Sequence, residues 1–286
     1  MKLKRLPAIV LSLFIGAVTP AVFPDTPTAG YRAVGMIGKT NTGSFAIGGS
    51  GVAISPDWVV GVSHVGGDTF VLNGQQYPIL QKIIHKVSEG EPADLALYKL
   101  GKPVPAYTRV LLAPFEGASV KLNKRTVLLV GYGRNATLRP DGLGWLPTAG
   151  TEGVKRVATN TIDLADTERY NIGSETTPRW KSSVCLAYDL DKPGDPSFST
   201  LGTAITDKEG GVAAKDSGGG WFVSYGGQTL LVAVSCTVGK PKDSTLPSDY
   251  CYGAMGFGIH LYAYRDWIYA NTGLADFAPT TAARKR

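Results

Sequence analysis

The sequence GVAISPDWVVGVSH (residues 51–64) contains two short apolar runs separated by Ser55, Pro56 and Asp57, and its second run ends at His64. Short runs rich in Val and Ile form strands, and a Ser-Pro-Asp sequence between two such runs favours a turn. The segment therefore predicts two strands joined by a turn, with His64 at the end of the second strand.

Similar runs recur on both sides of this segment. They lie at residues 33–37, 51–54, 58–62, 69–72, 95–100, 126–130 and 229–234. The 286 residues include 36 Gly and 18 Pro, and only 18% are charged, which favours short elements joined by tight turns. Regularly spaced short strands are typical of β-sandwiches and barrels. Residues 134–200, with several Pro and an Asp-Gly pair, predict extended surface loops instead.

The sequence LYAYRDWIYA (residues 261–270) has convincing helical periodicity, and Asn271 and Gly273 follow it as stop signals. We expect one terminal helix on an all-β body. A hydrophobic content of 43% is enough to bury a sizeable core, in one large or two modest domains.

Two further segments contain side chains that can act together with His64. PADLALYKL (residues 92–100) has Asp94 at the head of an apolar strand, and KDSGGG (residues 215–220) has Ser217 in a glycine-rich loop. A serine hydroxyl is a weak nucleophile and needs an imidazole to accept its proton. A buried carboxylate fixes the imidazole tautomer, and glycine-rich backbone can direct N–H groups at an oxyanion. The three segments therefore predict a Ser-His-Asp triad.

In motif and order, the chain resembles the chymotrypsin/trypsin-like serine proteases from about residue 32 to residue 267. GSGVAIS at 49–55, VGYG at 130–133, VSC at 234–236 and YRDWI at 264–268 extend the resemblance beyond the triad. It implies two antiparallel Greek-key β-barrels with a C-terminal helix. Residues 22–123 would form the barrel that contains His64 and Asp94, and residues 124–277 the barrel that contains Ser217 and the closing helix.

The resemblance also implies a function, that of a secreted serine endopeptidase that forms an acyl-enzyme. His64 would act as general base and then acid, Asp94 as its orienting partner and Ser217 as the nucleophile. Backbone N–H groups of Lys215 and Ser217 would form the oxyanion hole. Asp216 would bind the ammonium of the mature N-terminus. The substrate-binding residues would be Gly211, Ser235, Cys236, Thr237 and Gly256, with Ser235 near Asp94 and residues 235–237 pairing with the substrate backbone.

Further expectations concern the substrate and the partners. Gly211 would lie at the base of the specificity pocket without a carboxylate, and Thr237 would narrow it, so small to medium apolar residues are expected before the scissile bond. The partner would be a protein or peptide substrate and the chain a monomer. Neither a cofactor nor a metal would be required, since no C-x-x-C or Cys/His cluster is present and the acidic residues at 189–195 lack an EF-hand's spacing.

Two positions depart from the family pattern. Lys215 stands where glycine is usual, and a flipped peptide there would remove an oxyanion-hole donor, at a cost of about 10²–10³ in rate. A catalytically inactive homologue that acts as a secreted binding module is therefore the alternative. Val65 replaces the cysteine that usually follows the histidine, so the disulfide beside His64 is absent.

The two ends of the chain predict export. Residues 1–21 combine Lys2, Lys4 and Arg5 with an apolar run at 8–18 and the small residues TPA at 19–21, as in a signal peptide. Cleavage there would leave a secreted protein, extracellular or periplasmic, that begins at Val22 and is active without a separate propeptide. An uncleaved anchor is the alternative.

The net charge of +6 comes from residues 1–5 and from a basic tail at 278–286 that we expect to be disordered. The rest of the chain is close to neutral and has no basic cluster interleaved with aromatics, which argues against nucleic-acid binding. Cys185, Cys236 and Cys251 allow at most one internal disulfide. We expect it between Cys236 and Cys251, whose loop is short.

Overall fold

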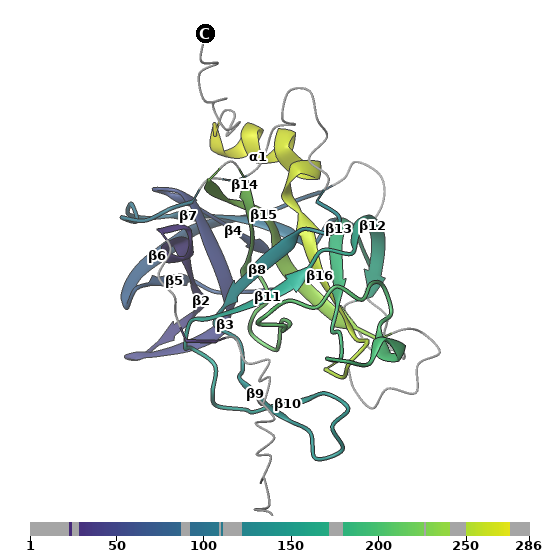
Figure 1. The fold of residues 1–286 in the computed structure, drawn as a ribbon. Helices are drawn as coiled ribbons and strands as arrows, with labels where there is room; N and C mark the ends of the chain where they lie inside the picture. Colours follow the sequence, from purple (N-terminus) through teal and green to yellow (C-terminus); the bar gives the residue numbers. More distant parts are fainter. Residues whose placement is uncertain are drawn as a thin grey trace, which may run out of the picture.

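The computed structural model describes residues 23–24, 29–86, 92–108, 110, 122–171, 180–225, 227–240 and 250–274. The expected signal peptide at 1–21, the expected new N-terminus at Val22 and the basic tail at 278–286 lie outside the described residues. Two β-sheets lie side by side in Figure 1, and the C-terminal helix lies beyond their upper edge.

The first sheet is a closed antiparallel barrel with strand order β2-β3-β4-β7-β6-β5. Strands β5 to β7 form a meander, and β4 pairs with β7, which is a Greek-key arrangement. Pairing of β2 with β5 closes the barrel. The strands are β2 (Val34–Asn41), β3 (Ser44–Ser55), β4 (Trp58–Val62), β5 (Thr69–Leu72), β6 (Gln75–Ile84) and β7 (Leu95–Leu100).

The predicted hairpin at residues 51–64 is confirmed as β3 and β4. Val52 pairs with Val60, and Ala53 with Val59. Ser55 stabilises the turn, because its hydroxyl accepts the N–H of Trp58 at 3.1 Å. The Val and Ile side chains of this hairpin are buried.

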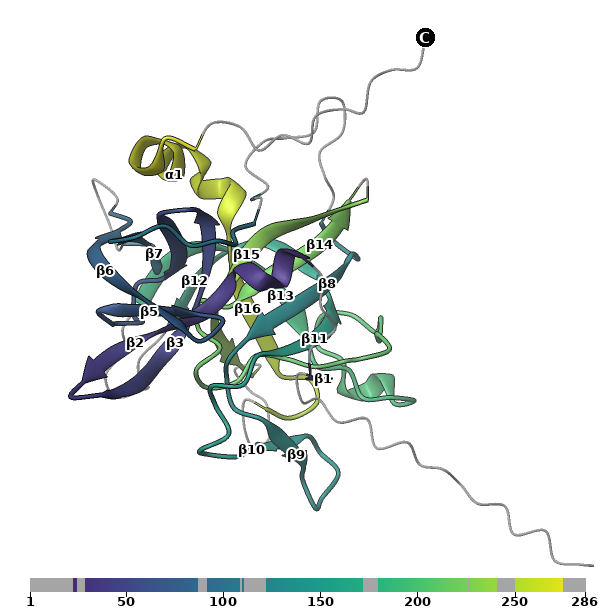
Figure 2. The same cartoon turned by 90° about the vertical axis from the view of Figure 1, so that its left-hand side faces the viewer.

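The second sheet has eight strands, in the order β1-β11-β8-β14-β15-β16-β13-β12. It curls into a half-barrel beside the closed barrel (Figure 1). Its edge strand β1 precedes the first barrel in sequence but pairs with β11, as Figure 2 shows. The strands are β1 (Phe23–Pro24), β8 (Thr126–Gly131), β11 (Arg156–Thr161), β12 (Leu164–Asn171), β13 (Trp180–Asp189), β14 (Gly220–Tyr225), β15 (Gln228–Gly239) and β16 (Met255–His260).

The expectation of surface loops throughout residues 134–200 is wrong. This region contains β11, β12, β13 and the hairpin of β9 (Ala136–Leu138) with β10 (Trp145–Pro147). Polar residues hide the strand pattern, because several are buried and bonded inside the fold. Asn160 in β11, for example, is buried and donates from Nδ2 to the carbonyls of Asp189 and Gly210, at 3.1 and 3.0 Å.

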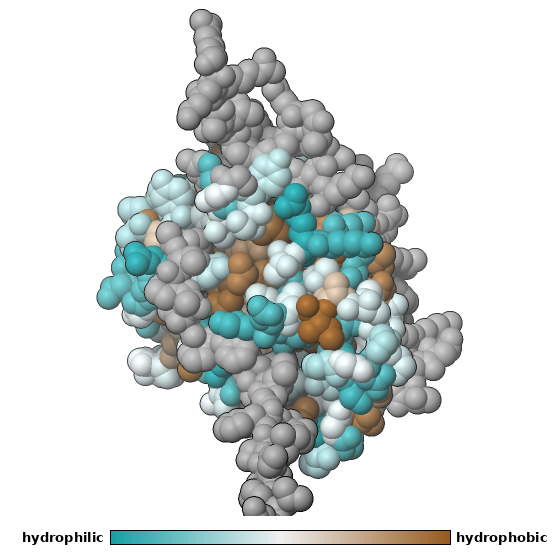
Figure 3. Space-filling view, in the orientation of Figure 1, coloured by the Kyte–Doolittle hydropathy of each residue, from teal (hydrophilic) through white to brown (hydrophobic). Residues whose placement is uncertain are grey.

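The expected terminal helix is confirmed as α1 (Arg265–Thr272), preceded by a 3₁₀ turn at Leu261–Tyr264. Gly273 ends it with a φ of 67°, a conformation that favours glycine. No helix among the described residues is long and apolar enough to cross a membrane. On the face in Figure 3 the described surface mixes hydrophilic and neutral residues with smaller apolar patches.

The predicted disulfide between Cys236 and Cys251 is wrong, since all three cysteines are buried thiols. Cys236 lies within β15, and its Sγ donates to the carbonyl of Phe257 at 3.1 Å. Cys251 lies beside Gly144, to which it forms a β-bridge. The short separation in sequence therefore does not bring the two sulfurs together, because β15 fixes one of them against β16.

Candidate active site

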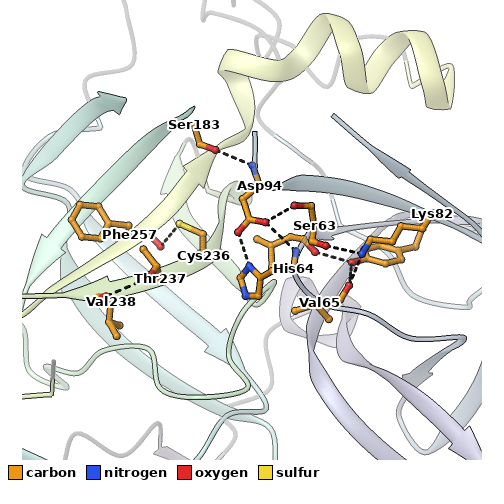
Figure 4. Close-up of polar contacts among 12 residues, drawn as sticks. Ser63, His64, Val65, Lys82, Asp94, Ser183, Cys236, Thr237, Val238 and Phe257 are labelled. Atoms are coloured by element: carbon orange, nitrogen blue, oxygen red, sulfur yellow. Dashed lines mark hydrogen bonds and ion pairs between the residues drawn. The ribbon is translucent and has the colours of Figure 1, made fainter. Parts of the chain in front are cut away.

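The pairing of β4 with β7 brings His64 and Asp94 together. Val62, the last residue of β4, pairs with Leu95, the first residue of β7, so residues just beyond these ends are neighbours. His64 Nδ1 lies 2.6 Å from Asp94 Oδ2, and His64 N donates to Asp94 Oδ1 at 3.0 Å (Figure 4). The Asp94 side chain is fully buried, whereas that of His64 is 31% exposed. The imidazole thus extends from a buried carboxylate towards the surface.

Further hydrogen bonds fix Asp94. The Ser63 hydroxyl donates to Oδ1 at 2.5 Å, so the buried carboxylate accepts three hydrogen bonds when His64 Nδ1 carries its proton. The backbone N–H of Asp94 donates to the Ser183 hydroxyl, on β13 of the second sheet, at 3.0 Å. A buried carboxylate is stable only when bonded in this way, and these bonds also fix its orientation.

Ser217 lies in a loop that is bound to both sheets. Its carbonyl accepts the N–H of Ser50 on β3 at 2.8 Å, and the next residue, Gly218, donates to the carbonyl of Ser235 on β15 at 2.7 Å. Gly218 has a φ of 88°, and a Cβ there would collide with the Ser50 carbonyl. Only glycine permits this close approach of the loop to the first barrel.

The turn before Ser217 contains Lys215 in a conformation that is unusual for a lysine. Asp216 N donates to the Ala213 carbonyl at 3.0 Å, and Lys215, at the third position of this four-residue turn, has a φ of 80°. The Lys215 carbonyl accepts the Ser50 hydroxyl at 3.0 Å. Of the hydrogen bonds formed among the described residues, none uses the backbone N–H of Lys215 or Ser217.

One pocket of about 290 Å³ joins His64 and Ser217. The structure thus brings the three predicted triad residues to one place, with Asp94 behind the histidine. The other residues that line the pocket are Val212, Ala213, Ala214, Ser235, Cys236, Thr237, Val238 and Tyr250. None of these other side chains carries a charge, so the pocket is suited to an uncharged group.

Some predicted binding residues are placed differently. Ser235, Cys236 and Thr237 line the pocket, but Gly211 and Gly256 are not among its lining residues. The fully buried Tyr188 occupies the space between these two glycines. A Cβ on Gly256 would collide with its ring, and a Cβ on Gly211 would lie 2.9 Å from its hydroxyl oxygen.

Tyr188 was not expected from the sequence, since it lies on β13 in the region assigned to loops. Its hydroxyl accepts the N–H of the pocket residue Val212 at 2.7 Å. The hydroxyl of Ser235, which lines the pocket, accepts Trp221 Nε1 at 2.9 Å. Val212, Ala213 and Ala214 were also not expected to line the pocket. They directly precede Lys215, and this position in the sequence could have identified them as pocket residues.

Asp216 is buried and lies near a buried cation. Burial raises the pKa of its carboxyl to about 6, and the N–H groups of Ala213 and Gly133 and the positive charge of Arg156 act in the opposite direction. Those N–H groups lie 2.9 and 2.6 Å from the carboxylate. The Arg156 guanidinium donates to the carbonyls of Gly133 and Thr151 at 2.5 and 2.6 Å. The ammonium expected at Val22 lies outside the described residues, so Arg156 is the cation described beside Asp216.

Two of the acidic residues at 189–195 lie in the protein interior. Asp189 and Asp191 are buried, and so is Glu209, whose carboxylate accepts the N–H of Thr206 at 3.1 Å. Burial raises the pKa of Glu209 to about 8, and burial together with the charge of Asp189 raises the pKa of Asp163. In the part of the chain that the structure describes, no group of three His, Cys, Asp or Glu side chains is arranged to hold a metal ion.

Comparison with known proteins adds no assignment, because no family model matches the chain and no curated protein is significantly similar to it. The fold itself is mostly β, with a closed barrel, a curled second sheet and one short C-terminal helix. This architecture is compatible with the chymotrypsin-like fold. Function therefore has to be inferred from the geometry of the site.

Proposed function

We propose that the protein is a serine endopeptidase of the chymotrypsin-like type. The observation that carries the proposal is the fully buried Asp94 carboxylate, 2.6 Å from His64 Nδ1, behind a histidine that shares a pocket with Ser217. A carboxylate, an imidazole and a hydroxyl in this order are the groups that acyl transfer to serine requires.

The proposed mechanism assigns one task to each group. Asp94 accepts a hydrogen bond from His64 Nδ1–H and so keeps the proton on Nδ1, which leaves Nε2 unprotonated and able to remove the hydroxyl proton of Ser217. The serine oxygen attacks the peptide carbonyl, and His64 then passes its proton to the departing amine. Water hydrolyses the resulting ester on Ser217, with His64 again acting as base.

The tetrahedral intermediate needs hydrogen-bond donors for its oxyanion. The backbone N–H groups of Lys215 and Ser217 are suited to this task, because no hydrogen bond within the described chain uses them. The positive φ of Lys215, 80°, is the conformation that glycine would adopt at this position of the turn. These two features support a formed oxyanion hole despite the lysine.

The pocket supports a preference for small or medium apolar residues before the scissile bond. Val212, Ala213 and Ala214 line it, and Tyr188, which bonds to Val212, fills the space between Gly211 and Gly256 where a deeper pocket was expected. A buried charge on the substrate would find no counter-charge among the lining side chains. We further propose that the enzyme is secreted, acts as a monomer and binds its peptide substrate along β15, at Ser235, Cys236 and Thr237.

A fluorophosphonate probe tests the proposal directly, because it reacts only with a serine activated by its neighbours. We expect label on Ser217 in the folded protein, with none in the Ser217→Ala variant and a large loss in His64→Ala. Circular dichroism of each variant shows whether it is folded. Folded wild-type protein without label would refute the endopeptidase and favour the binding module.

A further inference from the structure

The segment around His64 is bonded to a lysine on a strand that contains no triad residue. Lys82, on β6, pairs across the sheet with Tyr98 on β7. Its ammonium donates to the carbonyl of Ser63 at 2.7 Å and to the carbonyl of Val65 at 2.8 Å. These carbonyls belong to the residues immediately before and after His64, as Figure 4 shows.

Tyr98 also hydrogen-bonds to the segment around His64. Its buried hydroxyl lies 2.8 Å from the carbonyl oxygens of Val62 and Val65 and can donate to either. Burial and the negative charge of Asp94 both raise its pKa, so the hydroxyl remains a neutral donor. The Lys82 ammonium lies 5.6 Å from the centre of the Tyr98 ring, within reach of a cation–π interaction.

Backbone hydrogen bonds also hold this segment, because Ser63 N–H donates to the Asp94 carbonyl at 2.8 Å and Val65 N–H to the Val62 carbonyl at 3.2 Å, but neither bond uses the carbonyls of Ser63 and Val65. Val65 stands where the family that the chain resembles has a disulfide-bonded cysteine, and its partner position is a glycine. A Cβ on Gly49 would lie only 2.6 Å from Val65 Cγ2 and 2.7 Å from the Ser217 carbonyl oxygen. Side-chain packing of Val65 against Gly49 fills space but does not fix the carbonyls, whereas charge-assisted hydrogen bonds have directional preference.

We propose that Lys82 is a positioning residue for catalysis, which fixes the backbone on both sides of His64 so that the imidazole stays aligned between Asp94 and Ser217. The proposal rests on the endopeptidase function proposed above. Ser63 links Lys82 to Asp94, because its carbonyl accepts a hydrogen bond from Lys82 and its hydroxyl donates one to Asp94 at 2.5 Å. Lys82 and the triad carboxylate thus act on the same residue from opposite sides.

The test compares Lys82→Met with a matched control, Lys99→Met. Lys99 belongs to the same barrel, lies 4.8 Å from the ring centre of Trp58 and pairs with Asp57, away from His64. With a fluorogenic peptide, Lys82→Met should lower kcat about 10- to 100-fold and leave KM within about threefold, because misplacement by about 1 Å costs about 10²-fold. Lys99→Met should leave both constants unchanged, and Lys82→Arg should recover part of kcat.

A spectroscopic readout separates positioning from general stability. The proton shared by His64 Nδ1 and Asp94 gives a low-field ¹H NMR resonance, which should broaden or disappear in Lys82→Met while the protein stays folded by circular dichroism. If Lys82→Met does not fold, Lys82→Gln retains a neutral NH2 donor group and should show the same losses to a lesser degree. An unchanged kcat and resonance in the folded variant would overturn the proposal.

The two proposals fail in different ways. Absence of fluorophosphonate label in folded wild-type protein would refute the endopeptidase itself. Label at the normal rate in both wild type and Lys82→Met would leave the endopeptidase intact and refute only the role of Lys82.

Discussion

Replacement of Lys215 by glycine tests how the turn before Ser217 sets activity. The turn is closed by the bond from Asp216 N to the Ala213 carbonyl, 3.0 Å, with Lys215 at its third position and a φ of 80°. Type II turns need a positive φ at that position and favour glycine, whereas type I turns need a negative one. The two types differ by a flip of the peptide between Ala214 and Lys215, which would turn the Lys215 N–H away from the oxyanion.

The size of the effect follows from the difference in free energy between the type II turn and the flipped type I turn. The left-handed conformation destabilises a residue with a side chain by about 1–2 kcal/mol. Lys215 adopts this conformation in the turn seen here but would not adopt it in the flipped turn. A difference of about 1 kcal/mol changes a ratio of conformers about fivefold. Lys215→Gly should therefore raise kcat/KM about two- to fivefold by depleting the flipped turn. The free energy of unfolding should change by less than about 1 kcal/mol, since glycine also gains entropy in the unfolded chain.

Lys215→Ala is the matched control, because alanine retains Cβ and its strain while losing the ammonium. It should behave like wild type in turnover of a peptide with a small apolar residue before the scissile bond, and in the rate of labelling by fluorophosphonate. Equal changes in Lys215→Gly and Lys215→Ala would assign the effect to the lysine charge. A lower kcat/KM in Lys215→Gly would refute the argument from the turn.

Three further substitutions test other parts of the site and its support. Asp94→Asn should retain the fold by circular dichroism but lower kcat about 10⁴-fold, since an amide holds the wrong imidazole tautomer; turnover near the wild-type rate would exclude the triad. Burial raises the pKa of Glu209 from 4.5 to about 8, so the folded protein binds more protons than the unfolded chain between these values and loses stability as pH rises through them. Glu209→Gln should flatten that decline by a few kcal/mol in urea unfolding at pH 5 and pH 8, and an unchanged decline would contradict the assignment. Arg156→Gln should destabilise the protein by about 3 kcal/mol at pH 8 and by less at pH 5, where Asp216, with a pKa of about 6, is already protonated; an equal loss at both pH values would show that the Arg156 charge does not act on Asp216.

The residues of the proposed triad could be placed together from the sequence because each lies beside a recognisable local pattern. His64 follows one apolar strand and Asp94 precedes another, and the strand ends meet once β4 pairs with β7. Ser217 follows Lys215 and Asp216 in a loop whose glycines mark a tight backbone approach, which the collision expected at Gly218 bears out. For these three residues, the local sequence pattern and the order of the strands were sufficient to predict that they lie together.

The pocket could not be predicted in the same way, since its shape depends on contacts between distant segments. Tyr188 comes from β13, whose strand pattern is obscured by polar residues, and it fills the space between Gly211 and Gly256. A glycine in a sequence can indicate that another group packs closely against the backbone, but it does not identify the residue that provides this group. The prediction of a disulfide was wrong for a related reason. The separation of two cysteines in sequence gives the length of the loop between them, but not the direction in which β15 orients the Cys236 side chain.

Each half of the molecule fixes groups of the proposed active site that belong to the other half. Ser50 of the first barrel binds the carbonyls of Lys215 and Ser217, through its hydroxyl at 3.0 Å and its N–H at 2.8 Å. Ser183 of the second sheet accepts the N–H of Asp94 at 3.0 Å. Because these bonds cross between the sheets in both directions, a change in how the sheets pack would move Ser217 and His64 relative to one another. The alignment of the triad is therefore a property of the packed pair of sheets, and neither sheet alone would provide it.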